Sequence, residues 1–114
     1  MEHASPQLED GHTRIANELL EAISRYPFNG TEARLLVMVI RLTYGWNRKA
    51  SLISCTLLSK NTGIDLRSVK RTMSRLIRNN VILKEKNNKI NSLGINKNYK
   101  SWICGKLKIR VTKL

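Results

Sequence analysis

The chain has 114 residues, 41% of them hydrophobic and 5% aromatic, which is enough for one domain with a modest, mainly aliphatic core. No apolar run approaches the roughly 20 residues of a membrane span, and the polar, acidic residues 1–10 lack the order of a signal peptide. The net charge is +13, and residues 1–30 hold five of the eight acidic residues but only two of the 21 Lys and Arg residues, so the basic remainder will attract a polyanion.

The first predicted helix follows the acidic arm. Ile15, Leu19 and Ile23 recur with helical spacing, so we expect an amphipathic helix that Thr13 caps and Pro27 ends. Its apolar face can pack on its own domain or on a second subunit, and the sequence leaves both arrangements open.

A capping box predicts the start of a second helix, because Asn29 is followed three residues later by Glu32. This helix should end near Tyr44, with Gly45 as its stop. Residues 35–40 are apolar on every side, which indicates the central and most buried helix of the fold.

Two further helices have the length and turn chemistry of a helix-turn-helix motif. A short strand at residues 51–53 precedes them. Ser54 can cap the first helix, Gly63 can end it, and Asp65 can cap the second, which runs to about Asn79.

The helix that begins after Asp65 has two chemically different faces. At 100° per residue, the apolar side chains that we expect to face the core are Leu66, Val69, Met73, Leu76 and Ile77. The opposite face and its flanks carry the residues that we predict to contact DNA: Arg67, Ser68, Lys70, Arg71, Ser74, Arg75 and Arg78. An arginine stripe on such a helix suits the major groove, where a guanidinium group can bind guanine O6 and N7.

Different roles are predicted along this helix. The first turns usually reach deepest into the groove, so we expect Arg67, Ser68 and Arg71 to read bases, and Arg75 and Arg78 to contact phosphates. A hairpin follows, with strands at residues 81–83 and 90–95. Its polar turn carries Lys86 and Lys89, which we predict to form a wing along the DNA backbone or in the minor groove.

The order of elements predicts a mainly α fold with a small β-hairpin, that is, a winged helix-turn-helix. We expect the DNA-binding domain to span residues 11–97, between a flexible acidic arm at residues 1–10 and a basic tail at residues 98–114. The alternation at residues 107–111 leaves open whether the tail forms a strand or an unpaired arm. The larger aromatic side chains are expected in the core, namely Tyr44, Trp46, Tyr99 and Trp102.

No residue pattern predicts an enzyme. Ser, Cys and His residues lack the spacing of a catalytic triad, and the basic part has no paired carboxylates for metal-assisted phosphodiester chemistry and no glycine-rich phosphate loop. Cys55 and Cys104 have no spacing for a disulfide framework or a zinc site. We therefore expect reduced thiols in a cytoplasmic protein, without a cofactor or metal.

Several segments together resemble one protein family. They are Gly11-His-Thr-Arg-Ile-Ala-Asn-Glu-Leu-Leu, Thr43-Tyr-Gly-Trp-Asn-Arg-Lys, Ile53-Ser, Thr62-Gly and Ile95-Asn-Lys-Asn-Tyr-Lys-Ser-Trp102. This combination, from about Gly11 to Trp102, is similar to the N-terminal, origin-binding domain of the phage replication protein O family. The resemblance implies a winged helix, dimeric binding to repeated origin sites, and recruitment of the replicative helicase or a helicase loader through a further C-terminal region. It also places the family's recognition helix on residues 65–79.

On this resemblance we expect a sequence-specific duplex DNA-binding protein that acts as a phage or prophage replication initiator in the bacterial host cell. Two other functions fit the same fold. One is a transcriptional regulator such as a repressor, whose sites would lie in promoters. The other is an RNA-binding or protein-interaction module, against which the arginine stripe argues.

Overall fold

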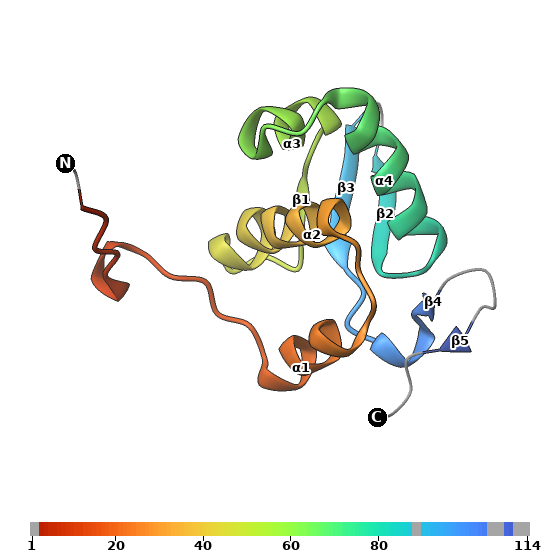
Figure 1. The fold of residues 1–114 in the computed structure, drawn as a ribbon, viewed down its shortest axis with the longest axis horizontal. Helices are drawn as coiled ribbons and strands as arrows, with labels where there is room; N and C mark the ends of the chain where they lie inside the picture. The colour runs from red at the N-terminus through yellow and green to blue at the C-terminus, as the bar shows by residue number, and fades with distance from the viewer. Residues whose placement is uncertain (1–2, 88–89, 105–108, 111–114) are drawn as a thin grey trace.

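The computed structural model describes residues 3–87, 90–104 and 109–110, and these confirm the predicted mainly α fold with a small antiparallel sheet (Figure 1). The helices are α1 (Asn17–Arg25), α2 (Gly30–Thr43), α3 (Cys55–Thr62) and α4 (Leu66–Arg78). The strands are β1 (Ala50–Leu52), β2 (Ile82–Asn87), β3 (Ile90–Ile95), β4 (Ile103–Cys104) and β5 (Ile109–Arg110). Short 3₁₀ turns are η1 (Leu8–Asp10), η2 (Tyr44–Trp46) and η3 (Tyr99–Ser101).

The main sheet has the order β1-β3-β2, with both pairs antiparallel. Gly94 of β3 pairs with Ala50 on one side and with Leu83 on the other. A Cβ at Gly94 would collide with the backbone oxygen of Lys49, so the close approach of β1 requires glycine at this position. Ile82, Leu93 and Ile95 face the core, whereas the alternate positions, including Leu52 and Leu83, are exposed on the outer face.

α2 is the central helix, as predicted, and contacts α3, α4, β1 and β3 (Figure 1). Leu35, Leu36 and Val39 are buried along it. Residues 35–40 are apolar on every side of the helix but are not all buried, because Val37 is 65% exposed. The neighbouring elements surround only part of the helix and leave one stripe in solvent.

The predicted N-caps of α2, α3 and α4 and the predicted glycine stop of α3 are confirmed. Asn29 and Glu32 form both hydrogen bonds of a capping box at the start of α2. The Ser54 side chain accepts a hydrogen bond in the first turn of α3, and Asp65 does the same in α4. Gly63 ends α3 in the left-handed conformation, with φ of 78°.

Two helix ends differ from the prediction. α1 begins at Asn17 rather than after Thr13, because Thr13 lies against Gly45 and Ile15 packs on the core in a non-helical segment. α2 passes into η2, and Asn47 rather than Gly45 takes the left-handed turn that ends it.

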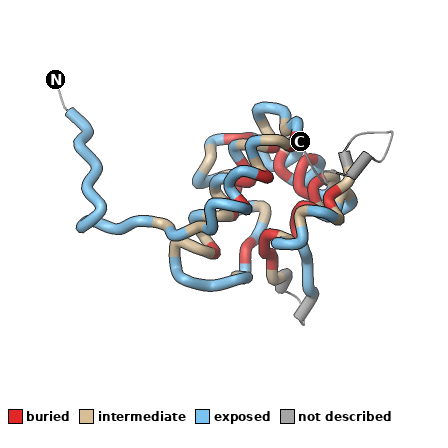
Figure 2. Tube along the Cα trace, turned by 90° about the horizontal axis from the view of Figure 1, so that it is seen from below, coloured by how far each residue is buried: buried red, intermediate tan, exposed pale blue. Residues whose placement is uncertain are grey.

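α1 packs on its own domain, which decides between the two arrangements left open by the sequence. Leu19 and Ala22 belong to the buried cluster shared with α2, the sheet and α4. Figure 2 shows buried residues gathered in the body of the molecule, while the segment before α1 is mostly exposed. None of the helices among the described residues is long and apolar enough to cross a bilayer.

The two tryptophans have opposite environments. Trp102 is fully buried, as expected, and its ring packs edge-on against Tyr26 and Phe28. The expectation that Trp46 is in the core is wrong, because this side chain is 62% exposed. It lies in η2, beyond the part of α2 that the sheet and the other helices cover. Tyr44 and Tyr99 are half-buried and pack against the core cluster.

The chain after residue 97 also contributes to the fold. Trp102 belongs to the core cluster, and β4 pairs with β5, so Ile109 and Arg110 form a strand within the predicted tail. The limits of the predicted arm, domain and tail stay predictions.

Candidate nucleic-acid interface

α4 is amphipathic and is the second helix of the helix-turn-helix. Its buried residues are Val69, Thr72, Met73 and Leu76. Leu66 was expected in the core but is 37% exposed, and Ile77 is only half-buried. The buried arc centres on Val69 and Leu76, so Leu66 and Ile77 lie at its edge, whereas Thr72 lies inside it.

The exposed side of α4 carries most of the residues predicted to contact DNA. Arg67, Lys70, Arg71, Ser74 and Arg78 are exposed, and Ser68 and Arg75 are half-buried. These side chains come from successive turns of one helix and form a cationic stripe. No acidic residue of α4 interrupts the stripe, because Asp65 precedes the helix as its cap.

Ser68 and Asp65 contact each other in the first turn of α4. The Ser68 backbone N–H donates a hydrogen bond to Asp65 Oδ2 at 3.0 Å. Side-chain and backbone hydrogen bonds from Ser68 hold the pKa of Asp65 below its ordinary value. The carboxylate is therefore charged at neutral pH and stabilises the positive end of the helix dipole.

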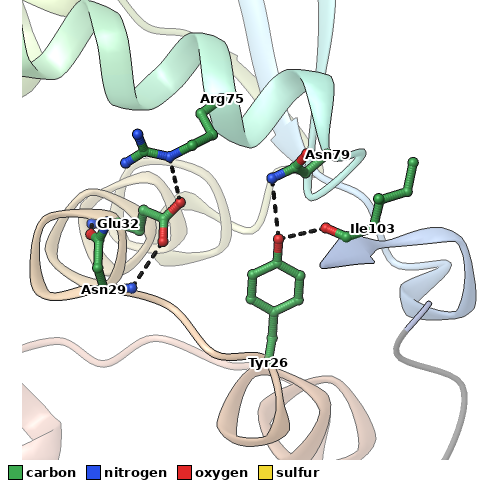
Figure 3. Close-up of polar contacts among 6 residues, drawn as sticks. All are labelled: Tyr26, Asn29, Glu32, Arg75, Asn79 and Ile103. Atoms are coloured by element: carbon green, nitrogen blue, oxygen red, sulfur yellow. Dashed lines mark hydrogen bonds and ion pairs between the residues drawn. The ribbon is translucent and has the colours of Figure 1, made fainter. Parts of the chain in front are cut away.

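Arg75 has an internal partner that the sequence did not predict. Its Nε donates to Oε2 of Glu32 at 2.9 Å, and Glu32 Oε1 accepts from the Asn29 backbone N–H at 2.9 Å (Figure 3). Glu32 is buried, with 6% of its surface exposed. One carboxylate thus caps α2 and pairs with α4. The only signal in the sequence was the capping box itself, which did not indicate the second partner.

We predict that Arg75→Ala lowers the free energy of unfolding by about 1–2 kcal/mol, because it leaves the buried Glu32 carboxylate without its cation while partial exposure screens the pair. Urea denaturation measures this loss. Arg78→Ala is the matched control, since Arg78 is exposed and should change stability by less than about 0.5 kcal/mol. Unchanged stability in Arg75→Ala, together with a smaller salt dependence of DNA binding, would assign Arg75 to a phosphate instead.

The carboxyl end of α4 is joined to the chain after β3. Tyr26 Oη donates to the Ile103 carbonyl oxygen at 2.6 Å, and Asn79 Nδ2 donates to Tyr26 Oη at 3.4 Å (Figure 3). The Ile103 backbone N–H donates to the Asn79 carbonyl oxygen at 2.9 Å. α4 is therefore anchored at its end by Tyr26, which follows α1, and by Ile103 of β4, while the Glu32 pair anchors its third turn to α2.

The hairpin predicted to form the wing is present as β2 and β3, and β2 contacts α4. Lys86 lies in β2, but nothing of its side chain is described, and Lys89 lies outside the described residues. Lys84 is a further exposed cation of β2 that the sequence interpretation did not single out. Its place in an alternating Lys-Glu-Lys run was the available signal.

These features are those of a winged helix-turn-helix whose second helix, α4, is cationic on its exposed face. Within the part of the chain that the structure describes, no three His, Cys, Asp or Glu residues are grouped as they would be to hold a metal ion.

Comparison with known proteins agrees with the resemblance seen in the sequence. The family model of bacteriophage replication protein O matches residues 5–102. The chain belongs to this family of phage replication proteins. No solved structure matches the chain.

Three phage proteins are similar to this chain. Replication protein 15 of Enterobacteria phage phi80 is 30% identical over 99 residues, which cover 87% of this chain and 33% of the relative. Replication protein O of Escherichia phage lambda is 32% identical over 95 residues, which cover 83% of this chain and 27% of the relative. DNA replication protein gp18 of Salmonella phage P22 is 31% identical over 102 residues, which cover 90% of this chain and 36% of the relative. The chain spans about a third of the length of these relatives.

Proposed function

We propose that this chain binds duplex DNA sequence-specifically and is the origin-recognising part of a phage replication initiator. α4 enters the major groove, with Arg67, Ser68 and Arg71 reading base edges and Arg78 binding a phosphate. The binding requires no catalysis. The observation that carries the proposal is the stripe of exposed cations on α4, the second helix of a helix-turn-helix in a replication protein O family member.

We assign the proposed DNA contacts along α4 according to the hydrogen bonds that hold this helix to the rest of the domain. Glu32 holds the third turn, and Tyr26 and Ile103 lie at the carboxyl end, so the amino-terminal turns are the part free to enter a groove. Ser68 reaches a base only if its hydroxyl exchanges the contact with Asp65 for one with the DNA. We therefore assign the leading role to Arg67 and Arg71, which are exposed.

Selection of bound duplexes from a random library, with competitor RNA present, tests this function. We expect a defined site that recurs in clusters within the parent replicon. Sites confined to promoters would indicate a regulator instead. Retention of the competitor RNA, or absence of any enriched duplex, would contradict sequence-specific duplex recognition.

We predict that Lys86→Ala combined with Lys89→Ala weakens binding to all duplex sequences and lowers the salt slope by about 1 to 2 units, because each lysine that neutralises a phosphate releases counterions. Titrations of specific and random duplexes over a salt series measure the slope. The control removes two other cations, Arg14 and Lys100, which are exposed outside α4 and the hairpin. An unchanged slope in the hairpin variant would contradict its role as a wing.

Dimeric binding and helicase recruitment remain predictions from the family resemblance. A recurring site with two half-sites on one face of the duplex would support a homodimer on DNA. Recruitment of a helicase is a property to be tested in a chain that spans the full length of the family's proteins.

A further inference from the structure

The exposed tryptophan of η2 lies apart from the helix that we propose to bind duplex DNA. Glu32, in the first turn of α2, contacts Arg75 of α4, whereas Trp46 follows the last turn, roughly 20 Å further along the helix axis. Figure 1 shows the chain leaving α2 on the side away from α4. A surface around Trp46 can therefore remain free when α4 lies in a groove.

The indole ring is held on the surface by its neighbours. The Arg41 guanidinium lies over the Trp46 ring, 5.5 Å from its centroid. A Cβ at Gly45 would come within 2.6 Å of Nη1 of Arg41, so the glycine leaves room for this guanidinium. Asn47 then turns the chain in the left-handed conformation. These contacts keep a large aromatic side chain 62% exposed, where burial would be its usual state.

Three exposed cations lie within five residues of Trp46 in the sequence. They are Arg41, Arg48 and Lys49, and none of them forms an ion pair within the described part of the chain. Lys97 lies over the neighbouring Tyr44 ring at 6.0 Å. A cleft of about 560 Å³ separates Trp46 and Arg41 from residues 10–13, which place one carboxylate, that of Asp10, on its far wall. The volume exceeds the roughly 300 Å³ at which ligand pockets begin.

We propose that Trp46 is a stacking platform for an unpaired nucleobase of single-stranded DNA, with Arg41, Arg48 and Lys49 binding the phosphates of the strand. An exposed aromatic ring among unpaired cations is the arrangement by which proteins bind single strands without reading their sequence. The bases of a duplex are already stacked and do not offer a free face to the indole. This activity is additional to duplex recognition by α4.

Tryptophan fluorescence tests the proposal directly, because Trp102 is fully buried and Trp46 is exposed. Titration with oligothymidine should quench the emission of the full chain. The Trp46→Phe variant retains a stacking ring and only the buried tryptophan, so it should bind without quenching. Trp46→Ala should weaken oligothymidine binding by about 5- to 150-fold, the range for loss of one stacked base.

Two controls separate this site from general effects. Val37→Ala removes another well exposed apolar side chain, 65% exposed on α2, and should leave oligothymidine affinity unchanged. Duplex affinity of Trp46→Ala should also stay within about twofold of the original. Its unchanged circular dichroism would show that the variant folds.

Three results would overturn the proposal. Oligothymidine fails to quench Trp46, or Trp46→Ala weakens duplex and single-strand binding equally, which would place the ring in the duplex interface. The third result is a change in Trp46 emission when the protein is diluted without DNA. It would mean that Trp46 contacts a second copy of the chain. Each result leaves recognition of duplex by Arg71 to be judged separately.

Discussion

Replacing Trp102 by alanine is expected to lower the free energy of unfolding by about 3–5 kcal/mol, the usual cost of deleting a large aromatic side chain from a core. The side chain has no exposed surface and packs against Tyr26 and Phe28. Its Nε1–H also donates to the Asn96 carbonyl oxygen at 2.8 Å, so the substitution removes a hydrogen bond as well as the packing. Urea denaturation followed by circular dichroism measures the loss.

A loss of this size can abolish folding, because domains of this kind are stable by only about 5–15 kcal/mol. Trp102→Phe therefore serves as the second variant, and we expect a smaller loss that leaves a measurable transition. Trp46→Ala is the matched control for removing a tryptophan, and its effect should stay within about 0.5 kcal/mol. Equal effects at Trp46 and Trp102 would contradict the packing described for the segment after β3.

Replacing Arg71 by alanine is expected to cost about 1–3 kcal/mol of binding free energy at the selected duplex site and to relax the preference at one base pair. Arg71 is exposed in the second turn of α4, before the turn that Glu32 anchors. A guanidinium in this place can form two hydrogen bonds to guanine. Affinities for the selected site, its single-base variants and a random duplex, all at one salt concentration, measure the effect.

Arg78→Ala is the comparison for Arg71→Ala, because Arg78 is an exposed arginine at the other end of the same helix. We expect it to weaken binding to selected and random duplexes alike and to lower the salt slope by about one unit. If Arg71→Ala behaves in the same way, with equal losses on both duplexes, Arg71 contacts the backbone and does not read a base.

The sequence predicts the elements well where the signal is local. The capping box at Asn29, the glycine stop at Gly63 and the Asp65 cap each depend on residues within one turn, and the structure confirms all three. The start of α1 was predicted wrongly, because the contacts that decide it join Thr13 to Gly45, far along the chain.

Tertiary packing also decides whether a side chain is buried or exposed where helical or strand periodicity does not predict it. Trp46 and Trp102 are the same residue type beside apolar segments, yet only Trp102 meets Tyr26 and Phe28 in the folded chain. In the candidate interface, helical periodicity predicts which face of α4 carries the cations. It cannot predict that Arg75 pairs with Glu32, because the two residues are 43 positions apart in the sequence.

The junction between α4 and β4 places the chain after β3 at one end of α4. Asn79 and Ile103 are joined by a backbone hydrogen bond, so the chain passes the carboxyl end of α4 as it leaves the core. Arg67 lies at the opposite end, roughly 17 Å along the helix axis. β4 therefore lies at the end of α4 remote from the turns that we propose to enter the groove. If α4 binds DNA in this way, the surface at β4 stays free for contacts with other machinery.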